Sequence, residues 1–392
     1  MAAGATLIAS CAGLNAPATP LPQPSPASSP EGVRRRSVIP GLARDNPPPP
    51  TLDQKLGAMI LAGFTGQTAA AGDQVGVDIQ QRYLGGVALF DYDVNGVPRN
   101  IASPSQLQTL DAQLQALASA TSQSTLIIGT DEEGGEVARL DQTHGFPPTV
   151  SAQYLGTIND PAVTYQYAAQ MAQTLRSAGL NINFAPDVDL NVNPNNPIIG
   201  ALGRSFSADP DIVTSMAEAF IRAHHDNGML TTLKHFPGHG SSTADSHLGF
   251  VNVTDTWSSI ELEPFRNIVH DGLADMIMTA HIFNAHLDPD YPATLSKATI
   301  TGILREQIGW DGVVSTDAME MGAISDNYGF EQAIALAVNA GADILLYGND
   351  GDDVVPRVLT ALKGFVSDGT ITEARIDQSW ARIQKLKSRL AV

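Results

Sequence analysis

Eight short apolar runs recur along this chain, and their spacing constrains its fold more than any other feature. Most of them are apolar at nearly every position, as expected of strands that are buried on both faces of a sheet. Amphipathic segments long enough for helices lie between them. The expected strands are 58–64, 85–90, 125–131, 181–189, 230–236, 275–282, 312–317 and 343–348. This alternation predicts an α/β fold with a parallel sheet.

The segments between the runs carry the start and stop signals of helices. Asp160-Pro161 and Asp209-Pro210 each place an N-cap residue before a proline at the first helical position. A leucine stripe predicts one buried helix face, made of Leu107, Leu110, Leu114 and Leu117. Glycines end four of the expected helices, namely Gly179, Gly228, Gly272 and Gly341.

Eight strands separated by helices predict a (β/α)8 barrel of the TIM type. We expect this barrel to form a single domain over residues 51–392, after a disordered N-terminal tether at residues 1–50. A doubly wound open sheet is the alternative. No glycine-rich dinucleotide fingerprint follows any of the runs, which disfavours a nucleotide cofactor.

The charge balance bears on the partners of this chain. Among 392 residues, 22 are Lys or Arg and 41 are Asp or Glu, giving a net charge of −19. Such a field repels phosphate groups, so we expect neither nucleic acid nor an anionic membrane surface to be a partner.

The N-terminal segment has the composition of a tether. Its single cysteine, Cys11, excludes an intrachain disulfide. The sequence Ile8-Ala9-Ser10-Cys11 has the form of a bacterial lipoprotein cleavage site, and a Pro/Ser/Ala-rich segment follows it. We therefore expect an exported, cell-envelope lipoprotein, attached to a membrane through lipidated Cys11. The apolar stretch before Cys11 is short and no basic residue precedes it, which a start codon further upstream would explain. A cytoplasmic protein with an incidental cysteine is the alternative.

Polar residues stand at the carboxyl ends of several expected strands, where barrel active sites lie. They are Asp131, Asp187, Asp189, Lys234, His235, His281 and Asp317. A barrel without a function has little reason to place charge there. Asp317 could serve as a nucleophile, as a metal ligand or as the N-cap of the next helix.

The stretch "KHFPGHGSSTADSH" at 234–247 concentrates three histidines in one loop. In extended backbone, residues i and i+2 point to the same side, so Asp245 can bond His247 and orient its ring. A histidine held in this way can protonate a leaving group and then deprotonate water. A solvated polar loop is the alternative reading, and His239 fits loop packing.

Other residues of the same segments can bind a sugar or a carbonyl oxygen. Lys234 and His235 offer hydrogen-bond donors, Asp131 offers an acceptor, and Arg139 and Arg204 offer bidentate donors. A surface ion pair is the alternative for each arginine. The adjacent His224 and His225 are expected on the exposed surface of a helix.

A metal centre is a further alternative, built from His235, His239, His247, His281 and Asp317. The spacing argues against it, because no His-x-His motif opens a strand. His235 and His239 would converge on a metal only from a helix, which Pro237-Gly238 forbids. We therefore predict a site without a metal or cofactor.

Six segments together resemble glycoside hydrolase family 3, in its single-domain β-N-acetylglucosaminidase (β-hexosaminidase) branch. They are "DEEGGEVARL", "NINFAPDVDLN", "LGRSF", "KHFPGHGSSTADSH", "MIMTAHI" and "VVSTDAMEMGA", in a region from residue 51 to the C-terminus. The resemblance implies that Asp317 is the nucleophile and that His247 is the acid/base, with Asp245 as its partner. It also implies that N-acetylglucosamine is held by Asp131, Arg139, Arg204, Lys234 and His235. In the larger β-glucosidase branch the acid/base is usually a carboxylate from a second domain, whereas this chain ends soon after its eighth expected strand.

The resemblance implies a retaining exo-β-N-acetylglucosaminidase that acts as a monomer, without cofactors, on peptidoglycan-derived muropeptide fragments. Phosphorolysis in place of hydrolysis is one alternative, and a non-catalytic sugar-binding lipoprotein is another. The chain departs from the family at Glu132 and Glu136, where Gln and Arg are frequent. Both changes are expected to add negative charge beside Asp131, which bears on substrate preference rather than on the reaction.

Overall fold

The computed structural model describes residues 49–121, 124–348, 351 and 353–390. The chain divides into two units, Met1–Pro49 and Pro50–Val392, and the description below concerns the second. The expected tether, with Cys11, lies outside the described residues except for its last two prolines.

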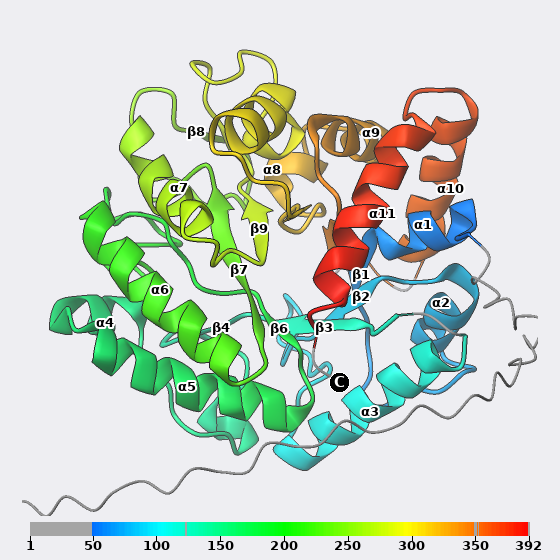
Figure 1. Ribbon diagram of the computed structural model, residues 1–392, viewed down its shortest axis with the longest axis horizontal. Helices are drawn as coiled ribbons and strands as arrows, with labels where there is room; N and C mark the ends of the chain where they lie inside the picture. Colours follow the sequence, from blue (N-terminus) through cyan, green and yellow to red (C-terminus); the bar gives the residue numbers. More distant parts are fainter. Residues whose placement is uncertain (1–48, 122–123, 349–350, 352, 391–392) are drawn as a thin grey trace, which may run out of the picture. The chain divides into compact units, whose positions relative to one another are not determined.

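Eight parallel strands form a nearly closed barrel with helices around it (Figure 1). The strands follow the order β1-β2-β3-β6-β7-β9-β11, and β12 lies beside β1. An isolated bridge between Ser315 and Ile344 brings the two ends of the sheet together. The barrel strands are β1 (Ile60–Gly63), β2 (Gly86–Ala88), β3 (Ile127–Thr130), β6 (Ile182–Asn183), β7 (Leu230–Phe236), β9 (Met276–Thr279), β11 (Val313–Ser315) and β12 (Leu345–Tyr347).

All eight predicted strands are present, and the predicted barrel is confirmed. The largest difference concerns the run 181–189, of which only β6 is a regular strand. Pro186 has no N–H to donate to a ladder, so regular pairing stops before it. Beyond it, Asp187 forms an isolated parallel bridge to Lys234. This short irregular segment brings carboxylates to the end of β7.

Helices and short strands complete the described part of the chain. The α-helices are α1 (Leu52–Ala58), α2 (Gln74–Arg82), α3 (Pro104–Ser119), α4 (Ala152–Ile158), α5 (Pro161–Ala178), α6 (Pro210–Asp226), α7 (Glu263–His270), α8 (Gly322–Ser325), α9 (Phe330–Ala340), α10 (Val354–Ser367) and α11 (Glu373–Lys387). The other helical elements are the 3-10 helices η1 (Gln142–His144), η2 (Ser259–Leu262) and η3 (Ala293–Leu295) and the π-helix η4 (Ala298–Gln307). Two small sheets are formed by β4 (Glu132–Gly134) with β5 (Val137–Ala138), and by β8 (Val251–Asn252) with β10 (Ile282–Phe283).

The residues that were predicted to begin, end or line these helices have those positions in the structure. Asp160 and Asp209 are the N-caps of α5 and α6, and each carboxylate accepts a hydrogen bond from a backbone N–H of the first turn. The four leucines of the predicted stripe are buried on α3. Gly179 ends α5 with a φ of 107°, a conformation that glycine adopts without the steric cost of a Cβ.

The prediction that His224 and His225 lie on the surface is wrong. His224 is fully buried, and its ring stacks on Phe220 with a centroid distance of 4.2 Å. Burial lowers the pKa of His224 to about 4, so the ring is neutral. His225 is partly buried and bonds Asp275 at 2.7 Å. Helix α6 packs against α4, α5, α7 and β7, so it buries a wider face than one amphipathic stripe.

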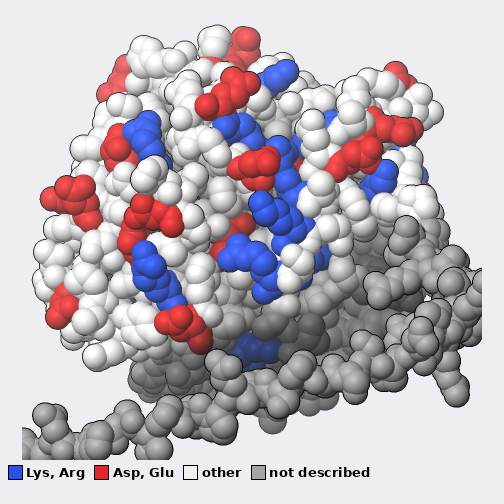
Figure 2. Space-filling view, viewed as in Figure 1, with Lys and Arg blue, Asp and Glu red and all other residues white. Residues whose placement is uncertain are grey.

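Lys and Arg side chains form a band on the face where α11 lies (Figure 2). Some of the arginines of this chain are paired inside the protein. Arg305, Arg375 and Arg382 all bind the buried carboxylate of Asp343, two residues before β12. No helix within the described ranges is long and apolar enough to cross a membrane.

Candidate active site

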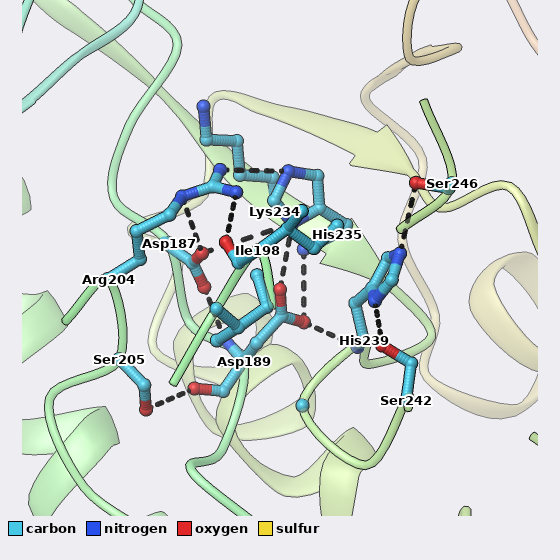
Figure 3. Close-up of polar contacts among 12 residues, drawn as sticks. Asp187, Asp189, Ile198, Arg204, Ser205, Lys234, His235, His239, Ser242 and Ser246 are labelled. Atoms are coloured by element: carbon cyan, nitrogen blue, oxygen red, sulfur yellow. Dashed lines mark hydrogen bonds and ion pairs between the residues drawn. The ribbon is translucent and has the colours of Figure 1, made fainter. Parts of the chain in front are cut away.

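Side chains from the ends of several barrel strands converge as the sequence predicts. Figure 3 shows the part of this cluster contributed by β7 and by the segment after β6. Lys234 and His235 belong to the end of β7. Asp131 follows β3, His281 follows β9 and Asp317 follows β11.

Lys234 is the centre of a buried ion-pair network. Its Nζ lies 2.5 Å from Asp131 Oδ1 and 2.6 Å from Glu133 Oε1. Burial lowers the pKa of Lys234, but the carboxylates of Asp131 and Glu133 outweigh burial and raise it. The ammonium group is therefore charged and fixed in place.

Glu133 was not predicted as a site residue. It links Lys234 to Arg204, whose Nε and Nη2 each lie 2.8 Å from a carboxylate oxygen of Glu133. Burial raises the pKa of Glu133, but the two cations outweigh it and hold this pKa far below its ordinary range. A signal was present in the sequence, because Glu133 is the i+2 neighbour of Asp131 in the segment that follows β3.

Arg204 is buried rather than paired at the surface. Besides Glu133, it donates to the carbonyl of Ile198 at 2.8 Å and lies 3.3 Å from His235 Nε2. Most of its N–H donors are therefore engaged within the protein. Its guanidinium group can offer a ligand little more than one free N–H.

A second cluster lies behind His235. Asp189 Oδ2 lies 2.7 Å from His235 Nδ1, and Asp189 Oδ1 accepts from the backbone N–H of His239 at 2.7 Å. Burial raises the pKa of Asp189, but His235 and His239 outweigh burial and lower it. Burial and the charge of Asp189 raise the pKa of Asp187 well above its ordinary value.

Asp187, Asp189 and His235 are also the group in the described residues that comes closest to a metal site, with ligand atoms within 4.8 Å of one another. The Nε of Arg204 lies 3.6 Å from Asp187 Oδ2, so the guanidinium group already supplies a positive charge next to this carboxylate. His235 Nδ1 is engaged with Asp189. These contacts suit an ion-pair network better than a divalent cation.

Asp317 is held beside three histidines. The side chain is partly exposed, and its Oδ1 accepts from the backbone N–H of Ala318 at 2.8 Å. Burial raises the pKa of Asp317, but His281, His235 and His247 outweigh burial and hold it below its ordinary value. Asp317 is not a helix N-cap, because α8 begins at Gly322 and Met321 precedes it as the cap.

His281 fixes the backbone next to Asp317. Burial lowers the pKa of His281, although the nearby carboxylate of Asp317 opposes this shift. Its Nε2 donates to the carbonyl of Ala318 at 2.9 Å, and its Nδ1 lies 2.7 Å from Thr294 Oγ1.

Asp245 and His247 form the predicted i, i+2 pair. Asp245 Oδ1 lies 2.7 Å from His247 Nδ1, and 59% of the His247 side chain is exposed. The carbonyls of Ser246 and His247 accept from the backbone N–H groups of Ala323 and Gly322, at 3.1 and 3.2 Å. Because α8 directly follows the segment of Asp317, these bonds hold the His247 loop beside Asp317.

The base of this loop is buried. His239 lies between two serines, with Nδ1 2.8 Å from Ser242 Oγ and Nε2 3.2 Å from Ser246 Oγ (Figure 3). Burial lowers the pKa of His239 to about 4, so this ring acts as a neutral hydrogen-bonding group. Its packing role agrees with the alternative reading of His239.

The Glu133 network makes one prediction about stability. Glu133→Gln should lower the free energy of unfolding by about 3 kcal/mol, because two buried cations lose their shared anion. Asp53→Asn is the control, because Asp53 and Lys363 form an exposed ion pair at 2.9 Å. This variant should lower the free energy of unfolding by less than about 1 kcal/mol. Urea unfolding of both variants measures this difference. Equal losses for the two variants would show that the network contributes no more than a surface pair.

Comparison with known proteins gives concordant matches. A sequence model described as the glycosyl hydrolase family 3 N-terminal domain matches residues 51–386. The chain is 35% identical over 324 residues to beta-hexosaminidase A of Pseudoalteromonas piscicida, covering 76% of this chain and 54% of that protein. It is 34% identical over 305 residues to beta-hexosaminidase LpqI of Mycobacterium tuberculosis, covering 76% of each.

Two solved structures share the fold described above. A glycoside hydrolase family 3 β-N-acetylglucosaminidase from Paenibacillus matches with a TM-score of 0.81 and 38% identity, over 87% of this chain and 63% of that one. A β-N-acetylhexosaminidase from Beutenbergia cavernae matches with a TM-score of 0.79 and 28% identity, over 87% of this chain and 99% of that one. The chain therefore spans about half the length of one curated relative and nearly all of a solved one.

Proposed function

Because the chain belongs to glycoside hydrolase family 3, we propose that it is a retaining exo-β-N-acetylglucosaminidase acting on peptidoglycan-derived fragments. The observation that supports the proposal is the Asp245–His247 pair, whose loop is hydrogen-bonded to α8, the helix that follows Asp317 in the chain. This pair supplies an acid/base from within the barrel. The names of the relatives, β-hexosaminidases and β-N-acetylglucosaminidases, support the choice of sugar.

In the first step, a carboxylate oxygen of Asp317 attacks the anomeric carbon and the glycosidic bond breaks. His247 gives the proton of Nε2 to the leaving oxygen. The lowered pKa of Asp317 keeps this carboxylate ionised, as a nucleophile requires. Asp245 accepts from Nδ1–H of His247, which leaves Nε2 free for the reaction.

In the second step, His247 Nε2 takes a proton from water while the water oxygen attacks the anomeric carbon. The bond between the sugar and Asp317 breaks, and the sugar is released with its original configuration. Residues of this chain supply both the proton donor and the nucleophile, so the scheme requires no metal or cofactor.

We assign the sugar contacts from the exposed fractions of the side chains. Asp131 and Arg139 expose 22% and 34% of their side chains, so we assign them the outer contacts to N-acetylglucosamine. Lys234, Arg204 and His235 are buried, and each has part of its hydrogen-bonding capacity committed to carboxylates. Their role is to form a rigid base of the sugar site, which presents the few N–H groups that are not already bonded to carboxylates.

An assay with an aryl β-N-acetylglucosaminide, run with and without phosphate, tests this function. We expect equal rates in both conditions and free N-acetylglucosamine as the product. A phosphate requirement with formation of the sugar 1-phosphate would show a phosphorylase instead. Binding of N-acetylglucosamine without turnover would show a sugar-binding protein.

We also propose export to the cell envelope with lipidation of Cys11, which lies outside the described residues. One relative, 33% identical over 79% of this chain, is named an uncharacterized secreted glycosyl hydrolase of Arthroderma benhamiae. The protein expressed from its native locus should fractionate with membranes, and Cys11→Ala should move it to the soluble fraction. Stable attachment requires more than one acyl chain, so mass spectrometry should find several on the N-terminal peptide. A wild-type protein found wholly in the cytoplasm would contradict this proposal.

A further inference from the structure

Glu132 is a buried carboxyl group in the loop that carries Arg139. It exposes 2% of its surface and begins β4, which pairs antiparallel with β5 in the register Glu132↔Ala138. Its backbone is tied to the barrel in both directions by the Asn183 side chain. The Glu132 N–H donates to Asn183 Oδ1 at 3.1 Å, and Asn183 Nδ2 donates to the Glu132 carbonyl at 2.8 Å.

The side chain of Glu132 closes this loop. Its Oε2 accepts from the backbone N–H of Leu140 at 2.8 Å. Together with the β4–β5 pairing, this bond fixes the residues on both sides of Arg139. The backbone position of Arg139 therefore depends on the hydrogen bond that the Leu140 N–H donates to Glu132.

Arg139 has few other constraints. Its Nη1 lies 3.6 Å from Asp91 Oδ1, and its guanidinium group lies 5.9 Å from the centre of the Phe90 ring. A partly exposed ion pair at that separation contributes little to fixing a long side chain. The backbone tie through Leu140 consequently fixes the point from which the Arg139 side chain extends.

The surroundings of Glu132 favour its neutral form. Its Oε1 is buried with no hydrogen-bond partner in the described residues, and no ion pair with a cation is found there for Glu132. A buried carboxylate without a paired cation is very unfavourable. The charged groups facing it are Arg139 and Asp141 of the same loop.

Two more titratable groups, Glu133 and Tyr167 of α5, line the cavity beside Glu132. The charge of Glu133 is already paired with Lys234 and Arg204. Burial raises the pKa of Glu132 to about 8, in agreement with a neutral group at pH 7.

We propose that Glu132 is a positioning residue. In its neutral form, the Glu132 carboxyl group holds the backbone of Leu140 and thereby aims Arg139 at the sugar. The inference rests on the proposed function through the role of Arg139. It also corrects an expectation from the sequence. The exposed Glu136 adds negative charge to this loop, whereas neutral Glu132 adds none beside Asp131 and resembles glutamine in shape and charge.

Three variants test the proposal. Glu132→Gln keeps an acceptor for the Leu140 N–H, Glu132→Leu fills the space without an acceptor, and Glu136→Gln removes an exposed carboxylate from the same loop. Amide hydrogen exchange over 136–141 and the calorimetric Kd for N-acetylglucosamine are measured at pH 7. Losing one hydrogen bond should speed exchange and weaken binding in Glu132→Leu by about fivefold to tenfold. Glu132→Gln and Glu136→Gln should match the wild type within about twofold in both measurements.

A pH series tests whether the neutral form of Glu132 holds the loop, and Glu132→Gln, which cannot ionise, is its reference. As pH rises from 7 to 9, the wild type should lose protection over 136–141 while Glu132 ionises, and Glu132→Gln should not. The proposal is overturned if folded Glu132→Leu keeps wild-type exchange, or if Glu132→Gln is as impaired as Glu132→Leu. It is also overturned if the wild type and Glu132→Gln respond alike to pH.

Hydrogen exchange separates this inference from the proposed function. If the wild type binds no N-acetylglucosamine, the proposed function fails, and the exchange rates alone then decide whether Glu132 positions this loop.

Discussion

Asp317→Ala should lose about four powers of ten or more in kcat on an aryl N-acetylglucosaminide, because no other group can form the covalent intermediate. Its side chain lies at the end of β11, is partly exposed and accepts one local backbone hydrogen bond. Its removal should therefore leave the fold and the binding of N-acetylglucosamine almost unchanged. Steady-state kinetics, thermal unfolding and calorimetry measure the three quantities.

Asp290→Ala is the matched control for this variant. Asp290 is an exposed aspartate between β10 and η3, in the segment that follows the barrel strand β9. It should retain wild-type kcat. If Asp317→Ala keeps more than about one hundredth of the wild-type rate while properly folded, Asp317 is not the nucleophile.

His247→Ala should separate substrates by their leaving groups. A natural disaccharide requires protonation of its bridging oxygen, whereas a nitrophenol leaves without much assistance. General acid catalysis contributes about 10²–10⁴-fold, and we expect the loss on the disaccharide to exceed the loss in aryl glycosylation by this factor. Pre-steady-state release of nitrophenol and disaccharide turnover give the two rates.

The second step of the same variant should be rescued by a small anion. Azide attacks the glycosyl-enzyme without a general base, so it should restore turnover of the aryl substrate and yield the glycosyl azide. Asp245→Asn should show a milder form of the same defect, because the His247 ring loses its orientation and part of its basicity.

His270→Ala is the control for the His247 experiments. His270 and Asp271 form another close His–Asp contact at 3.0 Å, exposed to solvent on α7. This variant should behave as the wild type does on both substrates. Equal losses on both substrates in His247→Ala, without rescue by azide, would assign His247 a structural role instead.

The barrel itself was predictable because its signals are local. Apolar runs mark strands that are buried on both faces, and Asp-Pro pairs mark the starts of α5 and α6. The carboxyl ends of parallel barrel strands meet at one face, so the approximate site followed from the strands alone. The Asp245–His247 contact was predictable because both residues belong to one loop. The structure forms it in a turn, where the Leu248 N–H donates to the Asp245 carbonyl at 3.1 Å, rather than in the extended backbone that the sequence suggested.

Contacts between distant segments were not predictable. Arg204 and Glu133 are 71 positions apart, and neither segment alone shows that their side chains meet in a buried pair. The ionisation of Glu132 likewise depends on burial by surrounding segments rather than on its sequence neighbours. His224 was misplaced because a helix that contacts three other helices and a strand buries residues outside its main stripe.

The stereochemistry of the released sugar tests the central claim most directly. Proton NMR of the reaction, recorded before mutarotation, resolves the anomeric signals of newly formed N-acetylglucosamine. Two displacements at the anomeric carbon, through a bond to Asp317, predict that the β-anomer appears first and the α-anomer follows only as the sugar equilibrates. Initial appearance of the α-anomer would show a single displacement by water and would contradict a covalent intermediate on Asp317.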